Sequence, residues 1–180
     1  VLNHETGRIF RVAPKASQAQ DWPGRYSDLR AMGDAELVAL QASKSDWHAR
    51  RARVILQGRA AKGTLTAQTR ADLTTLFRTE SNADVRLRAM WALHVTGGWT
   101  SDSLAEALAD RDEYVRAWAI QLLCEDGTPP LRVLETFARM ARDDRSAVVR
   151  LYLTSALQRL DRAARWNIAD ALLAHAEDAA

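Results

Sequence analysis

Histidine and cysteine are among the residue types that most often support catalysis or bind metal ions. The four histidines are scattered, as His4, His48, His94 and His175, with no pair at the spacing that places two metal ligands on one helix face. The single cysteine, Cys124, lacks a neighbouring histidine or basic cluster to lower its pKa, as a nucleophile requires. We therefore expect no catalytic residue, no metal site and no bound cofactor.

Arginine forms the one dense charge group, made of Arg50, Arg51, Arg53 and Arg59. It is interpreted as a solvated helix face, with a phosphate-binding patch as the alternative. The formal net charge is only +2, so the pI near 9.0 reflects a small arginine excess and does not imply nucleic acid. Gly97 and Gly98 follow a predicted helix rather than a strand, which is typical of a helix stop and not of a phosphate loop.

Composition is that of one soluble domain: 180 residues, 47% hydrophobic and 27% charged. No apolar run approaches the roughly 20 residues that a membrane-spanning helix needs, so we expect no membrane insertion. The chain opens at Val1 without methionine, and we expect it to be part of a longer or processed protein.

Four stretches repeat one apolar pattern at helical period. Aligned at Ala52, Ala89, Ala119 and Leu153, they are spaced by 37, 30 and 34 residues, the length of a helical hairpin. Each stretch is predicted to be the second helix of a hairpin. The first helices are predicted near residues 34–43, 66–79, 101–109 and 129–142, with an unpaired fifth near 162–176. The fold expected is all-α: an α-α superhelix of four hairpins plus one C-terminal helix.

Within this frame, small residues at 52, 89 and 119 allow helices to approach closely. An arginine recurs at one frame position, as Arg86, Arg116 and Arg150. These arginines are interpreted as structural. Their expected partners are carboxylates such as Asp84, Asp112 and Asp144.

The first thirty residues differ from the rest. Residues 7–12, Gly-Arg-Ile-Phe-Arg-Val, are rich in strand-forming types and predict a short extended segment. Residues 13–24 contain two prolines and are typical of a linker. The domain division is therefore 1–28, an extended segment and linker left from a preceding β domain, and 29–177, the repeat domain.

The Val-Arg-x-x-Ala-x-x-Ala-Leu pattern resembles HEAT repeats over about residues 34–160. Residues 4–12 followed by 34–60 also resemble a junction in large bacterial proteins described as membrane-bound dehydrogenases of planctomycete and verrucomicrobial type. That resemblance implies a β-propeller before the repeats, a c-type haem domain after them, and an extracytoplasmic location. Any redox activity would belong to those other parts, because this chain contains no Cys-x-x-Cys-His.

The function expected is a non-catalytic scaffold that binds a protein or a neighbouring domain of the same polypeptide. One alternative is a nucleic-acid-binding domain related to the HEAT-like alkyl-purine DNA glycosylases. Those need a strongly basic groove and a catalytic aspartate, and the small net charge argues against it. A carrier of a small enzyme site, like the chromophore lyases on similar repeats, is a third alternative without support in the sequence.

The binding face follows from helical geometry. At about 100° per residue, positions −2, +2 and +5 from each aligned residue point away from the core stripe. These positions predict an exposed concave row with Trp91 as its anchor and Arg50 at its rim, unless an uneven twist buries Trp91 between repeats. The row comprises Arg50, Val54, Leu87, Trp91, His94, Gln121, Leu151 and Ser155, with Gln57, Ala117, Cys124 and Gln158 at the remaining positions.

A second predicted contact surface lies at the C-terminal end of the stack. The helix near 162–176 contains Trp166, Ile168, Leu172 and Leu173 but has no second helix to cover it. Because solenoids need a polar cap at such an end, we expect self-association through this helix or fraying of it.

Overall fold

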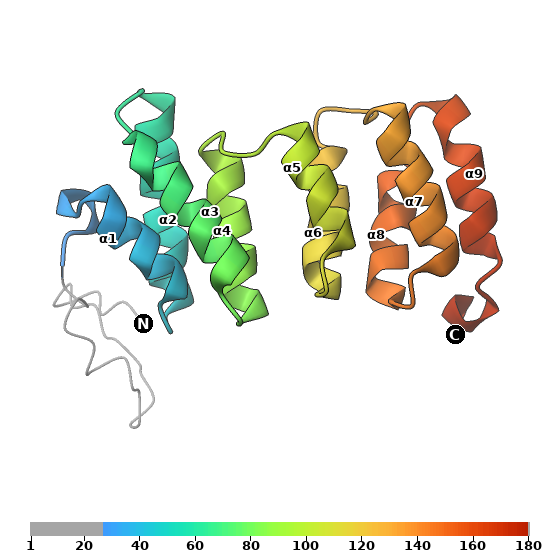
Figure 1. Cartoon of the computed structure of the whole chain (residues 1–180), viewed down its shortest axis with the longest axis horizontal. Helices are drawn as coiled ribbons and strands as arrows, with labels where there is room; N and C mark the ends of the chain where they lie inside the picture. The colour runs from blue at the N-terminus through green and yellow to red at the C-terminus, as the bar shows by residue number, and fades with distance from the viewer. Residues whose placement is uncertain (1–26, 180) are drawn as a thin grey trace, which may run out of the picture.

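The computed structural model describes residues 27–179, and this part of the chain folds into nine α-helices without a strand (Figure 1). The predicted extended segment at 7–12 and the predicted linker at 13–24 lie outside the described residues. The helices are α1 (Asp34–Ala39), α2 (Asp46–Ala61), α3 (Ala67–Thr79), α4 (Ala83–Val95), α5 (Ser101–Glu106), α6 (Glu113–Leu123), α7 (Leu131–Asp143), α8 (Ala147–Ala156) and α9 (Arg162–Leu173).

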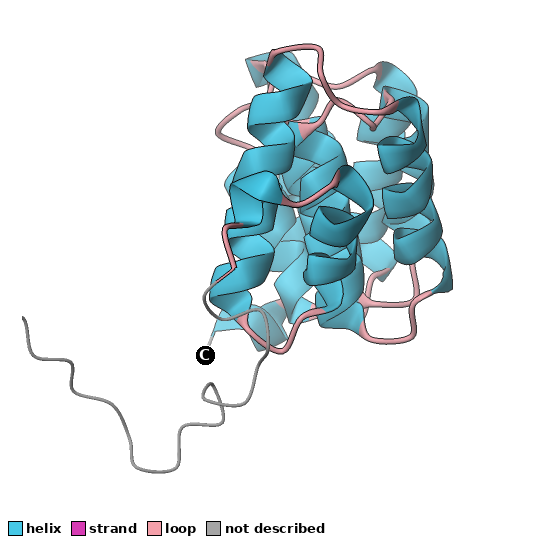
Figure 2. Ribbon diagram, turned by 90° about the vertical axis from the view of Figure 1, so that its left-hand side faces the viewer, coloured by secondary structure: helices cyan, strands magenta, loops and turns pink. Residues whose placement is uncertain are grey.

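Consecutive helices pair as antiparallel hairpins, α1 with α2 through α7 with α8, and α9 follows as a single helix (Figures 1 and 2). Short 3₁₀ turns, Leu40–Ala42 and Ala107–Ala109, extend α1 and α5. The predicted all-α solenoid of four hairpins plus one helix is thus confirmed, with the helices close to their predicted bounds.

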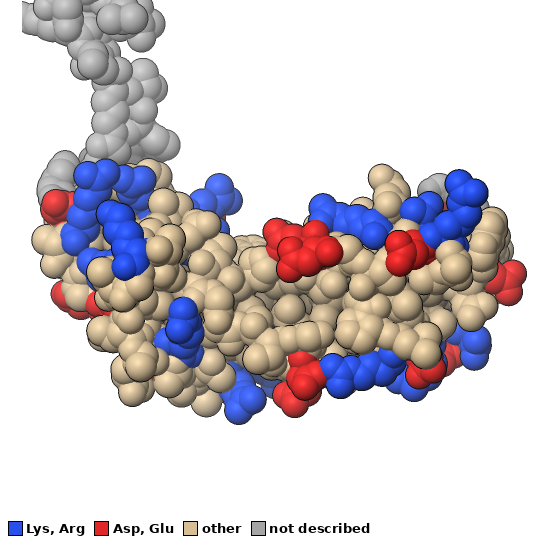
Figure 3. Space-filling view, turned by 90° about the horizontal axis from the view of Figure 1, so that it is seen from above, with Lys and Arg blue, Asp and Glu red and all other residues tan. Residues whose placement is uncertain are grey.

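The helices form two layers, with the second helices α2, α4, α6 and α8 packed side by side in chain order behind the first helices in Figure 1. Seen from above, the stack is curved, and the long side that carries the second helices is hollow (Figure 3). The side of the second helices that the sequence predicts to bind a partner therefore lies on the inside of the curve.

Helix ends follow local side-chain chemistry. Asn82 accepts hydrogen bonds from the backbone N–H groups of the first turn of α4, and Asp112 does the same for α6. Such caps satisfy donors that a helix start leaves unpaired. Gly97 ends α4 with a φ of +68°, a left-handed conformation that glycine adopts without strain.

The core runs along the facing stripes of the two layers. Ala52, Ala89 and Ala119 are completely buried, as the close approach of second helices requires. On α4, Val85, Ala89, Ala92 and Leu93 lie on one side of the helix and are all buried. Among residues 27–179, no helix is long and apolar enough to cross a membrane.

Candidate functional site

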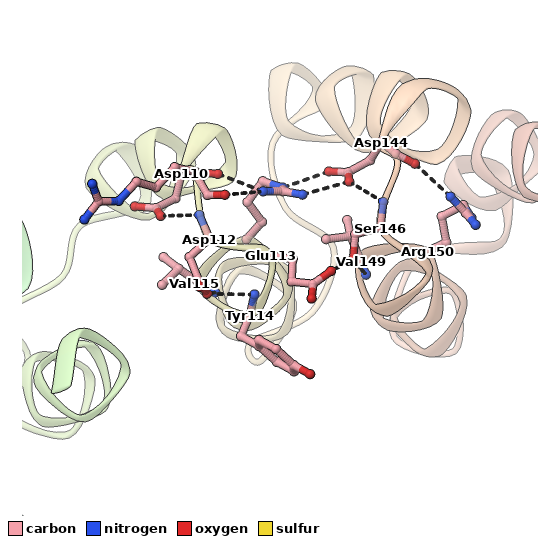
Figure 4. A network of polar contacts seen from close by, with 11 residues as sticks. Asp110, Asp112, Glu113, Tyr114, Val115, Asp144, Ser146, Val149 and Arg150 are labelled. Atoms are coloured by element: carbon pink, nitrogen blue, oxygen red, sulfur yellow. Dashed lines mark hydrogen bonds and ion pairs between the residues drawn. The ribbon is translucent and has the colours of Figure 1, made fainter. Parts of the chain in front are cut away.

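An arginine ladder, Arg86, Arg116 and Arg150, joins the second hairpin to the third, the third to the fourth, and the fourth to the 3₁₀ turn Ala176–Ala179 that follows α9. Figure 4 shows Asp110, Asp144 and Arg150 of this ladder. Arg116 donates to both carboxylate oxygens of Asp144, 28 residues further along the chain, and to the carbonyl oxygen of Asp110 at 2.9 Å. Arg150 repeats this arrangement with the carboxylate of Asp178 and the carbonyl oxygen of Asp144. Each guanidinium therefore ties the end of its own first helix to the end of the next one.

The first member of the ladder, Arg86, donates to Phe77 O at 3.0 Å and binds the carboxylate of Asp110. The structural role predicted for these arginines is confirmed, but two of the three expected partners are wrong. Asp112 caps α6, and the side chain of Asp84 lies on the surface beside α2 rather than on the ladder. The carboxylates that the arginines bind belong to the following repeat, because the superhelical stacking brings that repeat against the start of each second helix.

An aromatic row, Trp91, Trp118 and Tyr152, crosses the second-helix layer. The rings of Trp91 and Trp118 meet edge to face, with centroids 5.0 Å apart, and Trp118 lies 6.3 Å from Tyr152. At the other end of the row, the Arg53 guanidinium lies 5.2 Å from the centroid of Trp91. All these side chains are half-buried, so the row forms part of the hollow surface as well as the contact between repeats.

Between α2 and α4 the hollow side contains an open groove of about 230 Å³, which we call the α2–α4 groove. Ala49, Leu87 and Trp91 supply its apolar lining. Its charged lining consists of the arginines Arg50, Arg53 and Arg88 and the aspartates Asp46 and Asp84. Two of these residues, Arg50 and Trp91, are the predicted rim and anchor of the binding row, and the structure brings them to one groove.

The three arginines of the groove have different surroundings. Arg88 is fixed: it donates to Ser43 O at 2.7 Å and to the Asp46 carboxylate at 2.5 Å. Arg53 forms no ion pair with any described residue, and its contact is with the Trp91 ring. Burial, together with the positive charges of Arg50 and Arg88, lowers the pKa of Arg53. A guanidinium nevertheless stays protonated, so its charge is left without a counterion.

Two buried donors at this groove have no hydrogen-bond partner among the described residues, Arg53 Nη1 and Trp91 Nε1. A buried donor without an acceptor destabilises a protein by about 1–3 kcal/mol, more when it is charged. Unpaired groups are uncommon in native structures, so each of these two donors calls for an acceptor such as water or a bound group.

The exposure of the other members of the predicted row differs between the outer and the central repeats. In the outer repeats its members are exposed, as with Val54 (53% exposed), Leu151 (64%) and Ser155. In the central repeats they are covered: Leu87 is only 7% exposed, and Trp91 and Gln121 are half-buried. The prediction of one continuous exposed row is therefore wrong in the centre. The physical reason is that α4 and α6 have a second helix on both sides, whereas α2 and α8 each have one.

Other candidates have structural partners. Half-buried His94 places Nε2 2.5 Å from Glu125 Oε2, at the end of α6. Arg59, a member of the basic cluster, binds Asp34 and donates to Met32 O, so it ties α2 to α1. Cys124 is buried, and burial raises its pKa to about 11. In residues 27–179, His, Cys, Asp and Glu nowhere gather in threes that could hold a metal ion.

Comparisons with family models, with curated proteins and with solved structures give no match. Five residues that line the α2–α4 groove were absent from the predicted row: Asp46, Ala49, Arg53, Asp84 and Arg88. Arg53 and Arg88 each stand one position from a row member in the repeat frame, at +1 and −1 from the aligned alanine. Because the α2–α4 groove lies between two helices, residues next to the outward positions of each helix also line it. A projection of one helix alone does not include these neighbouring residues.

Proposed function

We propose that the repeat domain is a non-catalytic scaffold that binds a protein, or a neighbouring domain of its own polypeptide, on its hollow second-helix side. The observation that carries this proposal is the α2–α4 groove. It combines an indole, an apolar lining and arginines on a surface open to solvent. Trp and Arg are the side chains that most often dominate binding energy at protein interfaces.

The rest of the hollow side supports this proposal. Val54, one turn beyond Arg50 on α2, and Leu151 at the opposite end are large apolar side chains with more than half of their surface exposed. Arg88 holds α4 to Ser43 and Asp46 at the start of α2, and the arginine ladder fixes the repeats that follow, so the surface is organised before a partner arrives. Preorganisation of this kind improves affinity because less conformational entropy is lost on binding.

Nucleic acid suits this surface less well than protein. A nucleic-acid backbone requires a continuous basic track. Positive side chains gather at the α1–α2 end of the stack, but acidic and basic side chains alternate along the remainder in the view from above (Figure 3). Asp46 and Asp84 also lie in the groove itself and would repel phosphates.

Site-specific photo-crosslinking tests the proposal. A benzoylphenylalanine is placed at Val54, on the hollow side, or at Leu131, an equally apolar and exposed position on α7 in the first layer. Both variants are expressed in the cells that naturally produce the protein. We expect a discrete cross-linked product, intermolecular or between domains, from position 54 and none from position 131. Equal products from both positions, or none from position 54, would contradict the proposal.

A further inference from the structure

Arg53 is the residue of the α2–α4 groove best placed to bind a ligand. Of the three arginines in the α2–α4 groove, it alone combines partial burial, a fixed position over an aromatic ring and an Nη1 without an acceptor. Arg88 is already bound to Asp46 and to carbonyl oxygens of the chain segment before α2. Arg50 is exposed at the rim and free to move toward a ligand.

We propose that the α2–α4 groove is a carboxylate-binding site that receives one acidic side chain of a partner polypeptide, with Arg53 as its principal ligand group. This inference rests on the proposed protein-binding function and deepens it by naming what the partner must present. The partner segment would place a Glu or Asp carboxylate between Arg53 and Arg50, beside the Trp91 side chain that lines the groove.

Charge complementarity favours a carboxylate. Three arginines and two aspartates line the groove, which leaves one positive charge for the ligand to neutralise. A carboxylate carries one negative charge, and its two oxygens match the fork of a guanidinium. A phosphate monoester carries between one and a half and two negative charges at pH 7 and would meet the carboxylates of Asp46 and Asp84.

The apolar part of the groove favours a side chain within a polypeptide over a free small anion. Ala49 and Leu87 lie beside Trp91 in the lining. They offer contact to the methylene groups of a glutamate and to an apolar neighbour in its sequence. A free anion would gain the charge interaction alone, which is weak near water.

Nuclear magnetic resonance of the ¹⁵N-labelled chain provides the test. The probe is the peptide acetyl-Leu-Glu-Leu-amide, compared with its neutral counterpart acetyl-Leu-Gln-Leu-amide and with acetyl-Leu-phosphoserine-Leu-amide. The indole N–H of Trp91 is assigned from its loss in Trp91→Phe. We expect a saturable shift of this signal with the glutamate peptide and at least tenfold weaker binding of the glutamine peptide.

Arg53→Gln should weaken binding of the glutamate peptide at least tenfold. Arg51→Gln is the matched control, because Arg51 lies on the same helix with the same charge but does not line the groove. It should change binding less than twofold. Circular dichroism and a urea titration of Arg53→Gln establish that the variant is folded at the temperature used.

Three results would overturn the carboxylate site: no shift with the glutamate peptide, equal binding of the glutamine peptide, or tighter binding of the phosphoserine peptide. Equal losses for Arg53→Gln and Arg51→Gln would also overturn it, because the effect would then be one of net charge. None of these results changes the cross-linking expected from position 54. Failure of the carboxylate site is thus distinguishable from failure of the scaffold proposal.

Discussion

Arg116 binds Asp144 across the junction of two repeats through two hydrogen bonds, from Nε and Nη2, each 2.8 Å long. The carboxylate also accepts the backbone N–H of Ser146 at 3.0 Å, at the turn before α8. Both side chains of the pair are largely buried. Asp144 thus connects the α5–α6 hairpin, through Arg116, to the turn between α7 and α8. It is therefore the most informative position at which to test the ladder.

Replacing Asp144 by alanine should strongly destabilise the fold. The change leaves the buried Arg116 guanidinium without its counterion, and breaking a buried pair in this way lowers stability by about 3–5 kcal/mol. Asp143→Ala is the control, because that neighbouring residue is exposed; its effect should stay within about 0.5 kcal/mol. Urea unfolding followed by circular dichroism measures both. Similar losses for the two variants would show that the ladder does not stabilise the stack.

The ladder also predicts loss of stability in acid. Burial by itself raises the pKa of Asp144, but hydrogen bonds from Arg116 and from the Ser146 N–H outweigh it, so the pKa lies below its ordinary value of 3.8. The pKa of Asp178 is likewise lowered, first by the hydrogen bond from Arg150. The unfolded chain therefore takes up protons at higher pH than the folded chain.

The stabilisation from these carboxylates should thus be complete above about pH 5, where the unfolded carboxyl groups are also ionised, and fall as the pH drops through the lowered folded values. Urea midpoints measured from pH 6 to pH 3 check this. The wild type should lose more stability over this range than Asp144→Asn, which has no proton to gain at that position. Parallel pH profiles for the two proteins would argue against a contribution from Asp144.

Trp91→Ala should lower the free energy of unfolding by about 2–3 kcal/mol. Its edge-to-face contact with Trp118 accounts for about 0.5–1.5 kcal/mol and its contact with Arg53 for about 0.5–1. Lost packing adds to these, but less than the roughly 3–5 kcal/mol of a fully buried tryptophan. Trp166→Ala, at a residue that is 68% exposed, should change stability by about 0.5 kcal/mol or less. If Trp91→Ala had no effect, Trp91 would be an exposed anchor as the sequence frame predicted.

The helices were predictable because their signals are local. The apolar stripe that includes Val85, Ala89 and Leu93 recurs at helical period, and Asn82 and Asp112 stand at helix starts where capping residues are favoured. Such features depend on neighbours within about four residues. The hairpin order then follows from the repeat spacing, without knowledge of how the hairpins twist against one another.

The candidate site depended on that twist and was only partly predictable. Arg86 and Arg116 bind carboxylates 24 and 28 residues further along the chain, and nothing near either arginine in sequence marks those partners. The exposure of Leu87 and Trp91 likewise depends on the second helices on either side of α4, which a single-helix projection omits. The sequence did predict Trp91 and Arg50 as members of the binding row, because both lie on the outward side of their helices. The groove forms where the outward sides of α2 and α4 meet.

Cys124 should react slowly with alkylating reagents. Burial raises its pKa from 9.0 to about 11, so the thiolate fraction at pH 7.5 is about 100-fold lower than for an unperturbed thiol. Limited access to the buried side chain slows the reaction further. Iodoacetamide labelling followed by mass spectrometry should show a rate at least about 100-fold below that of the urea-unfolded chain, rising with pH toward 11. Rapid labelling of the folded protein at pH 7.5 would indicate that the end of α6 opens readily.

The C-terminal end of the stack should support weak self-association. Ile168 on α9 is buried, whereas Trp166 and Leu173, exposed by 68% and 85%, lie outside the packed side of the helix. Trp166 also lines a shallow hollow with Leu157, Arg162 and Arg165. Neighbouring exposed apolar side chains of this size are typical of contact surfaces, and a second copy of the chain offers the same apolar groups in return.

Sedimentation velocity over a hundredfold range of concentration measures this association. We expect the average mass of the wild type to rise with concentration and that of Trp166→Glu to stay at the monomer value, because a carboxylate in an apolar contact loses its hydration. Tyr114→Glu is the control, since Tyr114 is an exposed aromatic residue at the start of α6, away from the end of the stack. It should associate like the wild type. A wild-type chain that stays monomeric throughout, or an equal effect of the two substitutions, would show that α9 ends the stack without a partner.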